Sequence, residues 1–176
     1  MILKTPNLIL RPWRKEDARC LYHFAKNPKI GPIAGWPPHQ SVEDSLYIIQ
    51  TVFSKRETYA IVKDDIPIGC VSLLIHPDGN HWWGEGSAEI GYWVGEEYQG
   101  RGYATEAGRQ LIKRAFEDLD IKRIYATYRI ENMASKRVLE KLGFEYYSRL
   151  NNVNYLNQPF VEIAMKLEKY FILKKC

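Results

Sequence analysis

Apolar residues recur along this chain with two periods, which together predict a mixture of strands and helices. Seven short segments are continuously apolar or alternate between apolar and polar residues, as β-strands do. They cover residues 8–12, 58–63, 67–76, 90–94, 123–128, 145–149 and 160–167. Four longer segments repeat apolar residues every three or four positions, which is typical of helices with one buried face. They cover residues 16–26, 41–53, 104–119 and 132–142.

Capping residues mark some boundaries of these helices. Ser41 with Asp44 three residues later resembles a capping box, and Asn132 is a good N-cap for the last helix. Gly143 is a natural residue to follow the end of that helix.

The connections between elements carry turn signals. Residues 64–65 predict a hairpin, residues 31–40 a loop around Trp36, and residues 81–86 a Gly-containing connection. We find no internal repeat, low-complexity segment or linker, so we expect one domain over residues 1–176.

Composition narrows the class of protein. The 176 residues, 45% of them hydrophobic, suffice for one core. The net charge of +4 is mild and no run of five Lys or Arg exists, so nucleic-acid binding has little support. Cys20, Cys70 and Cys176 form no Cys-x-x-Cys pair, which argues against disulfides and zinc. We expect a cytoplasmic protein with neither a secretion signal nor a membrane span.

The segment 90–107 carries the strongest chemical signal. An apolar strand leads through a short acidic turn into a loop with Gly100 and Gly102, and a helix follows. Such a unit directs several backbone N–H groups to the positive end of a helix dipole, where phosphate binds. A dinucleotide-binding fingerprint needs a glycine in place of Thr105, and a P-loop needs Lys-Ser/Thr at residues 103–104. The structural alternative is a tight turn that uses two glycines.

Four stretches of sequence point to one family. Residues 99–104, Gln-Gly-Arg-Gly-Tyr-Ala, fit the pattern Gln/Arg-x-x-Gly-x-Gly/Ala. Together with residues 5–17, 88–94 and 131–144, they resemble motifs of the GNAT acetyltransferase superfamily. The resemblance is to its RimJ/RimL branch, the ribosomal-protein N-terminal acetyltransferases and their relatives. It covers the core of the domain, from about residue 3 to about residue 169.

The resemblance implies a fold and a reaction. The fold is α+β, with a mixed, mostly antiparallel twisted sheet of about seven strands flanked by about four helices. The reaction moves an acetyl group from acetyl-coenzyme A (acetyl-CoA) to a primary amine by direct transfer in a ternary complex. No metal is implied. The residues matched to cofactor-binding positions are Trp93, Val94, Gln99, Gly100, Arg101, Gly102, Tyr103, Ala104, Asn132 and Ser135.

The resemblance also supplies candidates for the groups that transfer protons. Ser135 would protonate the departing thiolate, and Glu89 is the best-placed general base. Tyr128 and Tyr155 are weaker candidates for either role. A structural alternative stands beside each main candidate: a local backbone hydrogen bond for Ser135 and a salt bridge at a strand start for Glu89.

The backbone of the central strand would serve the acyl group. An N–H near Trp93 or Val94 would bind the thioester carbonyl and its oxyanion. Alternation places Glu89, Gly91 and Trp93 on one face of this strand.

The acceptor is open at this level. Trp36, Trp82 and Trp83 would receive a cationic amine, with core packing as the alternative for each. A protein N-terminus, a polyamine and a small-molecule amine all fit as the acceptor. The oligomeric state is also open, and a homodimer fits the sequence. Which of three basic residues touches a cofactor phosphate is also open: Lys136, Arg137 or Lys141. A catalytically idle coenzyme A-binding regulatory module is the alternative function.

Overall fold

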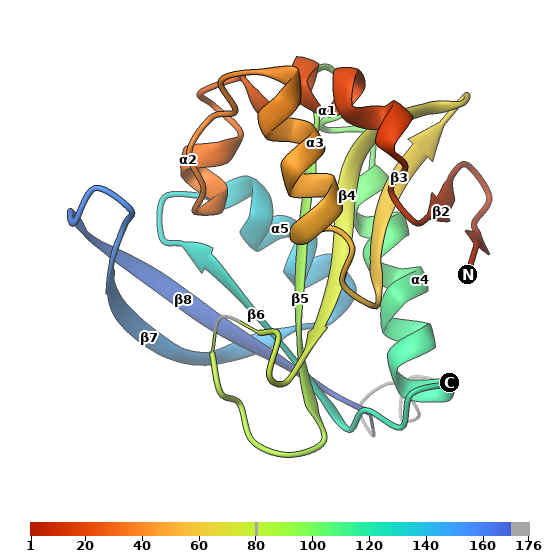
Figure 1. Cartoon of the computed structure of the whole chain (residues 1–176). Coiled ribbons are helices and arrows are strands. Elements are labelled where there is room, and N and C mark those ends of the chain that lie inside the picture. Colours follow the sequence, from red (N-terminus) through yellow and green to blue (C-terminus); the bar gives the residue numbers. More distant parts are fainter. Residues whose placement is uncertain (80, 170–176) are drawn as a thin grey trace.

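The computed structural model describes residues 1–79 and 81–169 and is built on a twisted eight-stranded sheet (Figure 1). The spatial order is β1-β2-β3-β4-β5-β6-β8-β7, and only β5 and β6 run parallel. The strands are β1 (Leu3–Lys4), β2 (Ile9–Arg11), β3 (Thr58–Lys63), β4 (Ile66–Ile75), β5 (Ser87–Val94), β6 (Arg123–Arg129), β7 (Glu145–Val153) and β8 (Pro159–Glu168). The expected fold is confirmed, with β1 as an added strand that is too short to show a period.

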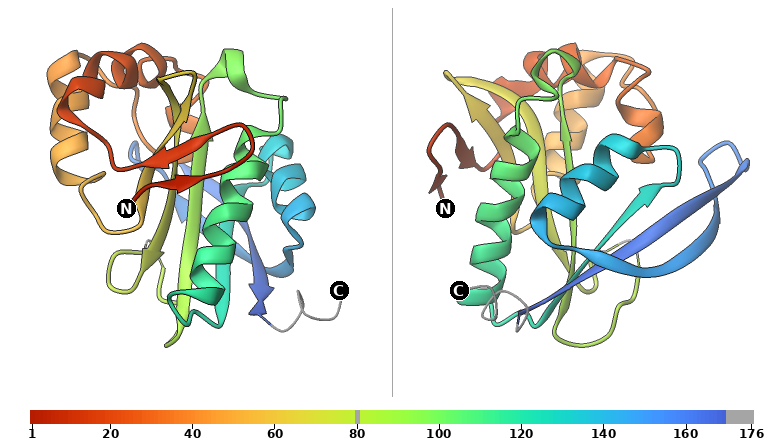
Figure 2. Two further views of the ribbon diagram at one scale, coloured as in Figure 1. Left: turned by 90° about the vertical axis from the view of Figure 1, so that its right-hand side faces the viewer. Right: turned by 180° about the vertical axis from the view of Figure 1, so that it is seen from behind.

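Helices cover both faces of the sheet, as Figure 2 shows. One face carries α4 and α5, and the other carries α1, α2 and α3. Their bounds are α1 (Ala18–Ala25), α2 (Gly31–Ala34), α3 (Val42–Thr51), α4 (Tyr103–Glu117) and α5 (Met133–Leu142). Among the described residues, no helix combines the length and apolarity needed to cross a bilayer.

Local chemistry explains where two of these helices differ from expectation. Residues 31–40 were expected to be a loop, but Pro32 opens the one-turn helix α2, because its fixed φ suits a first turn. The helix expected at residues 16–26 begins as a 3₁₀ turn over Lys15–Asp17.

The predicted caps are present. The Ser41 hydroxyl accepts the Asp44 N–H at 3.1 Å, although the Asp44 carboxylate turns to the Gln40 N–H instead of completing the box. Gly143 ends α5 with φ +89°.

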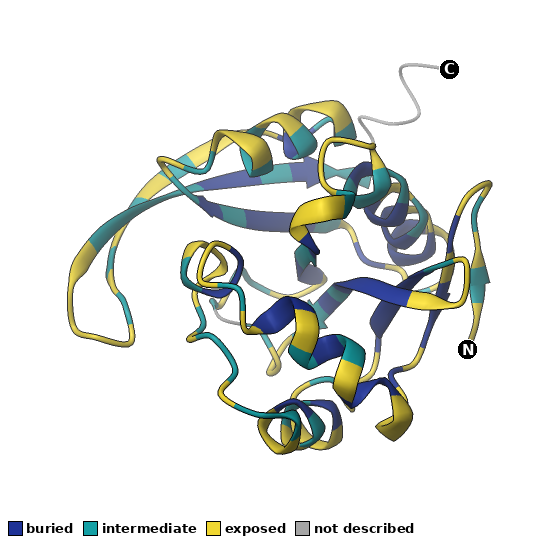
Figure 3. Cartoon of the chain, turned by 90° about the horizontal axis from the view of Figure 1, so that it is seen from above, coloured by how far each residue is buried: buried dark blue, intermediate teal, exposed yellow. Residues whose placement is uncertain are grey.

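Alternation along the strands gives each face its own core. Toward α4 and α5 the sheet buries residues such as Ile61 and Ile124, against Leu111 of α4 and Leu139 of α5. The other face is smaller and packs Ala60, Val62 and Cys70 against α1 and α3. Figure 3 shows this buried interior and the β7–β8 hairpin, which extends outward with an exposed tip. Cys20 and Cys70 are free thiols, and Cys176 lies outside the described residues.

A buried ion pair fastens α4 to the sheet. Arg114 of α4 donates two hydrogen bonds to Glu57, which precedes β3, at 2.6 and 2.7 Å, and the Tyr59 hydroxyl donates a third at 2.8 Å. The hydrogen bond from Arg114 lowers the pKa of Glu57, and burial raises the pKa of Tyr59 to about 12. This network holds α4 in a fixed position under β3.

Removing the cation tests the importance of this pair. We expect Arg114→Gln to lower the free energy of unfolding by about 3–5 kcal/mol, because it leaves a buried carboxylate unpaired. Urea denaturation at neutral pH measures the loss. Lys113→Gln, in an exposed pair with Glu117 on the same helix, should change it by less than about 0.5 kcal/mol. Similar losses in both variants would contradict the assigned role.

The same pair gives stability a pH dependence. The folded pKa of Glu57 lies below the ordinary glutamate value, so its contribution is fully present above that ordinary value. It is lost as the pH falls through the lowered folded value. The stability difference between the natural chain and Arg114→Gln should therefore shrink on acidification.

Candidate functional site

The sheet opens between its two parallel strands. β5 and β6 pair only from Ser87–Arg123 to Glu89–Tyr125, after which no pairing joins them. Beyond this point β5 continues beside β4, and β6 continues beside β8. A gap therefore runs between the C-terminal halves of β5 and β6.

The backbone pattern of β5 shows which groups face the gap. Gly95 N–H donates to Ile68 O, so every second residue back along β5 pairs with β4, including Trp93 with Cys70. The N–H and C=O groups of Tyr92 and Val94 consequently point away from β4, into the gap. Of the two donors expected from the sequence, Val94 fits, whereas the Trp93 N–H is directed to β4.

The loop that follows β5 presents an array of free backbone donors. Within the described chain, none of the N–H groups of residues 100–105 donates to another group, and the first helical bond of α4 is Glu106 N–H to Gly102 O. Gly100 and Gly102 have φ of +73° and +84°, which side chains disfavour, and a Cβ on either would meet open space. Six consecutive donors thus stand at the positive end of a fifteen-residue helix, where an anion is favoured.

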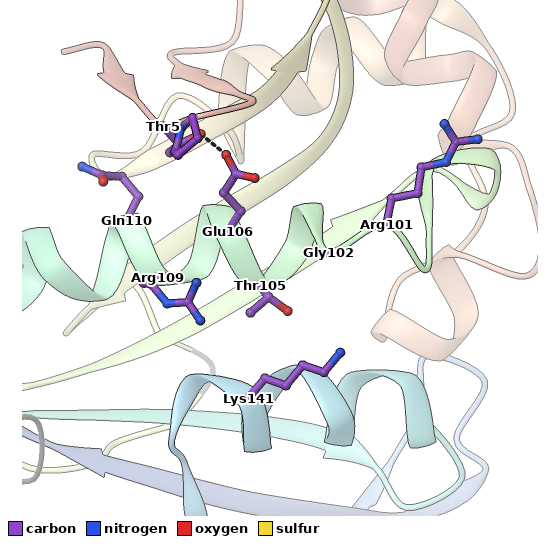
Figure 4. Close-up of a pocket in the computed structure, with 9 residues that line it drawn as sticks. Thr5, Arg101, Gly102, Thr105, Glu106, Arg109, Gln110 and Lys141 are labelled. Carbon is purple, nitrogen blue, oxygen red and sulfur yellow. Dashed lines mark hydrogen bonds between the residues drawn. The ribbon is translucent and has the colours of Figure 1, made fainter. Parts of the chain in front are cut away.

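Cationic side chains surround a pocket of about 450 Å³ beside these donors. Arg101, Arg109 and Lys141 line it together with Thr105. Figure 4 shows the side chains of Arg109 and Lys141 pointing into the space between α4 and α5. Lys136 instead pairs with Glu140 at 3.7 Å and lines a different pocket, and Arg137 is exposed on α5.

One carboxylate also lines this pocket, but hydrogen bonds compensate it. Glu106 accepts from the Thr5 hydroxyl at 2.6 Å, the Asn7 N–H at 2.8 Å and the Asn7 amide at 3.0 Å. These bonds tie the β1–β2 turn to the first turn of α4 and form one wall of the pocket. Three cations against one anion leave the pocket positive.

Internal contacts hold the donor loop in shape. The Gln99 amide donates to Val94 O at 3.0 Å, and the Gln99 N–H donates to Glu96 O. Gln99, expected to bind a ligand, therefore uses its backbone N–H and one N–H of its side-chain amide within the loop itself. Phe24 of α1 lies against Gly95, where a Cβ would approach its ring to 2.5 Å.

A tyrosine bridges the gap to α5. The Tyr92 hydroxyl lies 3.1 Å from Ser135 O and 3.0 Å from Ser135 Oγ. Asn132 caps this helix by accepting the Ser135 N–H at 3.0 Å. Desolvation raises the pKa of Tyr92, so its hydroxyl stays protonated. The Ser135 hydroxyl thus has a fixed neighbour at the edge of the gap.

Glu89 lies at the closed end of the gap, on the face opposite α4 and α5. It is buried, accepts from Trp83 Nε1 at 3.1 Å and lies 3.4 Å from His81 Nδ1. Trp83 in turn stacks on Tyr125 at 4.5 Å. The predicted common face of Glu89, Gly91 and Trp93 is confirmed. The alternate residues Ile90, Tyr92 and Val94 pack into the core toward α4 and α5, whereas Trp93 packs into the core on the other face.

The three tryptophans expected to meet an amine have different surroundings. Trp36 packs edge to face on Trp93 at 5.9 Å, beside the gap. Trp83 is fixed by Glu89 and Tyr125. Trp82 is exposed, and its ring contacts that of His76.

The weaker proton-transfer candidates lie away from this site. Tyr128 is buried on the α4–α5 face of the sheet and lines the same pocket as Lys136. Tyr155 is exposed at the tip of the β7–β8 hairpin. Within the described ranges no cluster of His, Cys, Asp and Glu could hold a metal ion.

Tyr92, Arg109 and the Thr5–Glu106 contact belong to the site but were not predicted from the sequence. Tyr92 carried a detectable signal, since alternation from Glu89 already placed it on the opposite face of β5. The contact between Thr5 and Glu106 joins residues 101 positions apart and had no local signal.

Comparison with known proteins gives this geometry a family. Residues 7–145 match the family described as "Acetyltransferase (GNAT) domain". The chain is 30% identical over 137 residues to the ribosomal-protein-serine acetyltransferase of Escherichia coli, covering 74% of this chain and 73% of that protein. It is 27% identical over 153 residues to the spermidine N(1)-acetyltransferase of E. coli, covering 86% and 80% respectively.

The fold has close counterparts among solved structures. One is Mycobacterium smegmatis RimJ in complex with CoA-disulfide, with a TM-score of 0.78 and 23% identity. The match covers 98% of this chain and 88% of that one.

Proposed function

The chain belongs to the GNAT acetyltransferase family and is an N-acetyltransferase, and on that premise we propose how its residues work. They hold acetyl-CoA as donor and deliver the acetyl group to a primary amine by direct transfer in a ternary complex. The observation that carries this proposal is the run of free N–H groups at residues 100–105, beside the gap between β5 and β6.

The donor loop and the adjacent pocket fit the anionic end of acetyl-CoA. The free N–H groups and the α4 dipole bind the diphosphate, and Lys141 and Arg109 contribute positive charge from the pocket wall. Lys141, rather than Lys136 or Arg137, is the basic residue of α5 that we assign to a cofactor phosphate.

The gap then receives the extended arm and its thioester. The Val94 N–H donates to the thioester carbonyl, and this bond strengthens as charge develops on the oxygen. The amine nitrogen attacks the carbonyl carbon, the carbon–sulfur bond breaks, and Ser135 Oγ–H protonates the departing thiolate. The amine loses its surplus proton to Glu89, and a proton returns from there through solvent to Ser135 Oγ, which restores the hydroxyl. The side chain of Asn132 caps α5 and thereby positions Ser135.

Tyr92 determines where the Ser135 proton points. A hydroxyl has one proton, so Tyr92 donates either to Ser135 O or to Ser135 Oγ. In the second arrangement the Ser135 proton is free to face the gap, and no heavy atom has to move. Tyr92 is therefore a positioning residue for the acid.

Glu89 is the proposed acceptor of the amine proton. How strongly the reaction needs a general base depends on the amine substrate. An α-amine of pKa ~8 is roughly one tenth neutral at pH 7, whereas a lysine-type amine of pKa ~10.4 is neutral in about one molecule in 2,500. The hydrogen bond from Trp83 Nε1 holds the Glu89 carboxylate in position.

An amine panel tests the proposed function. Purified protein with acetyl-CoA should release free thiol in the presence of at least one class among serine-initiated peptides, spermidine and small aminated compounds. Mass spectrometry should find no acetyl group on the protein, because transfer is direct. Thiol release from no amine would favour the idle coenzyme A-binding module, and a covalent acetyl-enzyme would refute direct transfer.

Two lysines of α5 give a matched test of cofactor binding. Lys141→Gln should weaken acetyl-CoA binding about tenfold, since it removes one charge-assisted hydrogen bond. Lys136→Gln, which alters a surface pair outside this pocket, should leave the affinity within about twofold. Calorimetric titration measures both, and equal effects would remove Lys141 from the phosphate site.

Two tyrosines and Ser135 give a matched test of the acid. Ser135→Ala should lower kcat by about 100-fold or more, with a small change in KM for acetyl-CoA. Tyr92→Phe should lower kcat by about tenfold, through the same hydroxyl. Tyr128→Phe, buried on the neighbouring strand, should stay near the natural rate. Normal turnover in Ser135→Ala would exclude it as the acid.

A further inference from the structure

The side chain of Arg129, the last residue of β6, has no polar partner in the described part of the chain. No carboxylate approaches its guanidinium within 4 Å, and its Nε is buried without a hydrogen bond. Arg11 and Arg114 contrast with it, because each is buried and held by two hydrogen bonds to a carboxylate. A partly buried charge without a counter-ion is costly, so Arg129 is prepared for a ligand that is not part of the chain.

The nearest carboxylate on the same face is engaged elsewhere. Glu162 is the direct cross-strand neighbour of Arg129 on β8. Its oxygens accept hydrogen bonds from Thr127 and Asn152 instead. Arg129 leans toward Phe160, with its guanidinium carbon 4.2 Å from the ring centroid. The ring fixes the plane of the guanidinium and leaves its edge available for a bidentate anion.

The position of Arg129 relates it to the acceptor. Alternation along β6 puts Arg129 on the face of Tyr125, which is also the face of Glu89 and Trp93. The pocket proposed to bind phosphate lies on the other face of the sheet, beside α4 and α5. Arg129 O also accepts the Asn132 N–H at 2.7 Å, so Arg129 stands one short turn before the helix that carries Ser135. Figure 1 shows α2 beside this end of β6.

We infer that Arg129 binds an anionic group, a carboxylate or a phosphate, on the acceptor, which therefore carries an anion as well as its amine. This inference rests on the proposed function, since it places the amine in the gap. It defines the orientation of the bound acceptor: the amine lies near Ser135 and Val94, and the anionic group lies near Arg129 and Phe160. It also disfavours a polyamine such as spermidine, which offers no anion.

Matched acceptors test this inference. Short peptides of increasing length are compared as free carboxylates and as C-terminal amides, with a phosphoserine-containing amide to distinguish phosphate from carboxylate. At one length or more, we expect the natural chain to prefer the anionic member by about tenfold in kcat/KM. Arg129→Gln should abolish the preference by slowing only the anionic member, and Arg129→Lys should restore part of it.

Arg149 provides the matched control. It is an exposed arginine of the adjacent hairpin, opposite Ile163 and so on the α4–α5 face. Arg149→Gln should leave the preference intact. The inference is overturned if the natural chain treats the two members of every pair alike, or if Arg129→Gln slows both equally.

A binding measurement separates this inference from the proposed function. Calorimetry of the same pairs with the coenzyme A-loaded protein reports the preference without turnover. If no peptide is acetylated but the natural chain binds the anionic members more tightly and Arg129→Gln does not, the transfer reaction fails and the anion site stands. Absence of any preference in binding overturns the anion site, whatever the turnover.

Discussion

The separation of β5 from β6 after three paired residues is the constraint on which the site depends. A sheet that stayed closed would use the backbone groups of Tyr92 and Val94 in its ladder, as it uses those of Trp93. The open sheet leaves the backbone groups of Tyr92 and the Val94 N–H for a ligand, while the Val94 C=O accepts from Gln99. It also places α4 and α5 with their N-termini at the opening. The bridge from Tyr92 to Ser135 crosses the opening at one point and keeps α5 in register with β5.

The two ends of the site rely on different electrostatics. At α4, backbone dipoles dominate, and side chains adjust the balance: Arg101, Arg109 and Lys141 add positive charge while hydrogen bonds compensate Glu106. Such a cradle suits a diphosphate, whose charge is spread over many oxygens. At the far side of the sheet, single side chains act at single points, with Glu89 near the closed end of the gap and Arg129 at the end of β6. A donor and an acceptor can therefore approach from opposite faces without competing for the same charges.

Much of the fold could be predicted from local sequence, and the reasons are visible in particular residues. Ser41, Asn132 and Gly143 mark helix ends because their preferences act over a few residues. The glycine loop could be recognised because positive φ at Gly100 and Gly102 is a local demand. The period of β5 correctly separated Glu89 from Tyr92. Features that depend on distant pairing had no such signal: the Glu57–Arg114 pair, the Thr5–Glu106 contact and the opening of the sheet itself. Gln99 has a role inside the loop that the motif match did not predict, since its side-chain amide and its backbone N–H hold the loop in shape. Its contact with a ligand stays a prediction.

We propose that the free N–H groups after β5, together with the gap, hold acetyl-CoA. Amide chemical shifts of isotope-labelled protein, followed by NMR during titration with acetyl-CoA, test it most directly. We expect the largest changes at the amides of residues 100–105 and of Val94, with the Trp93 amide, which is bonded to β4, changing less. Changes confined to other surfaces, with these amides unmoved at saturation, would contradict it.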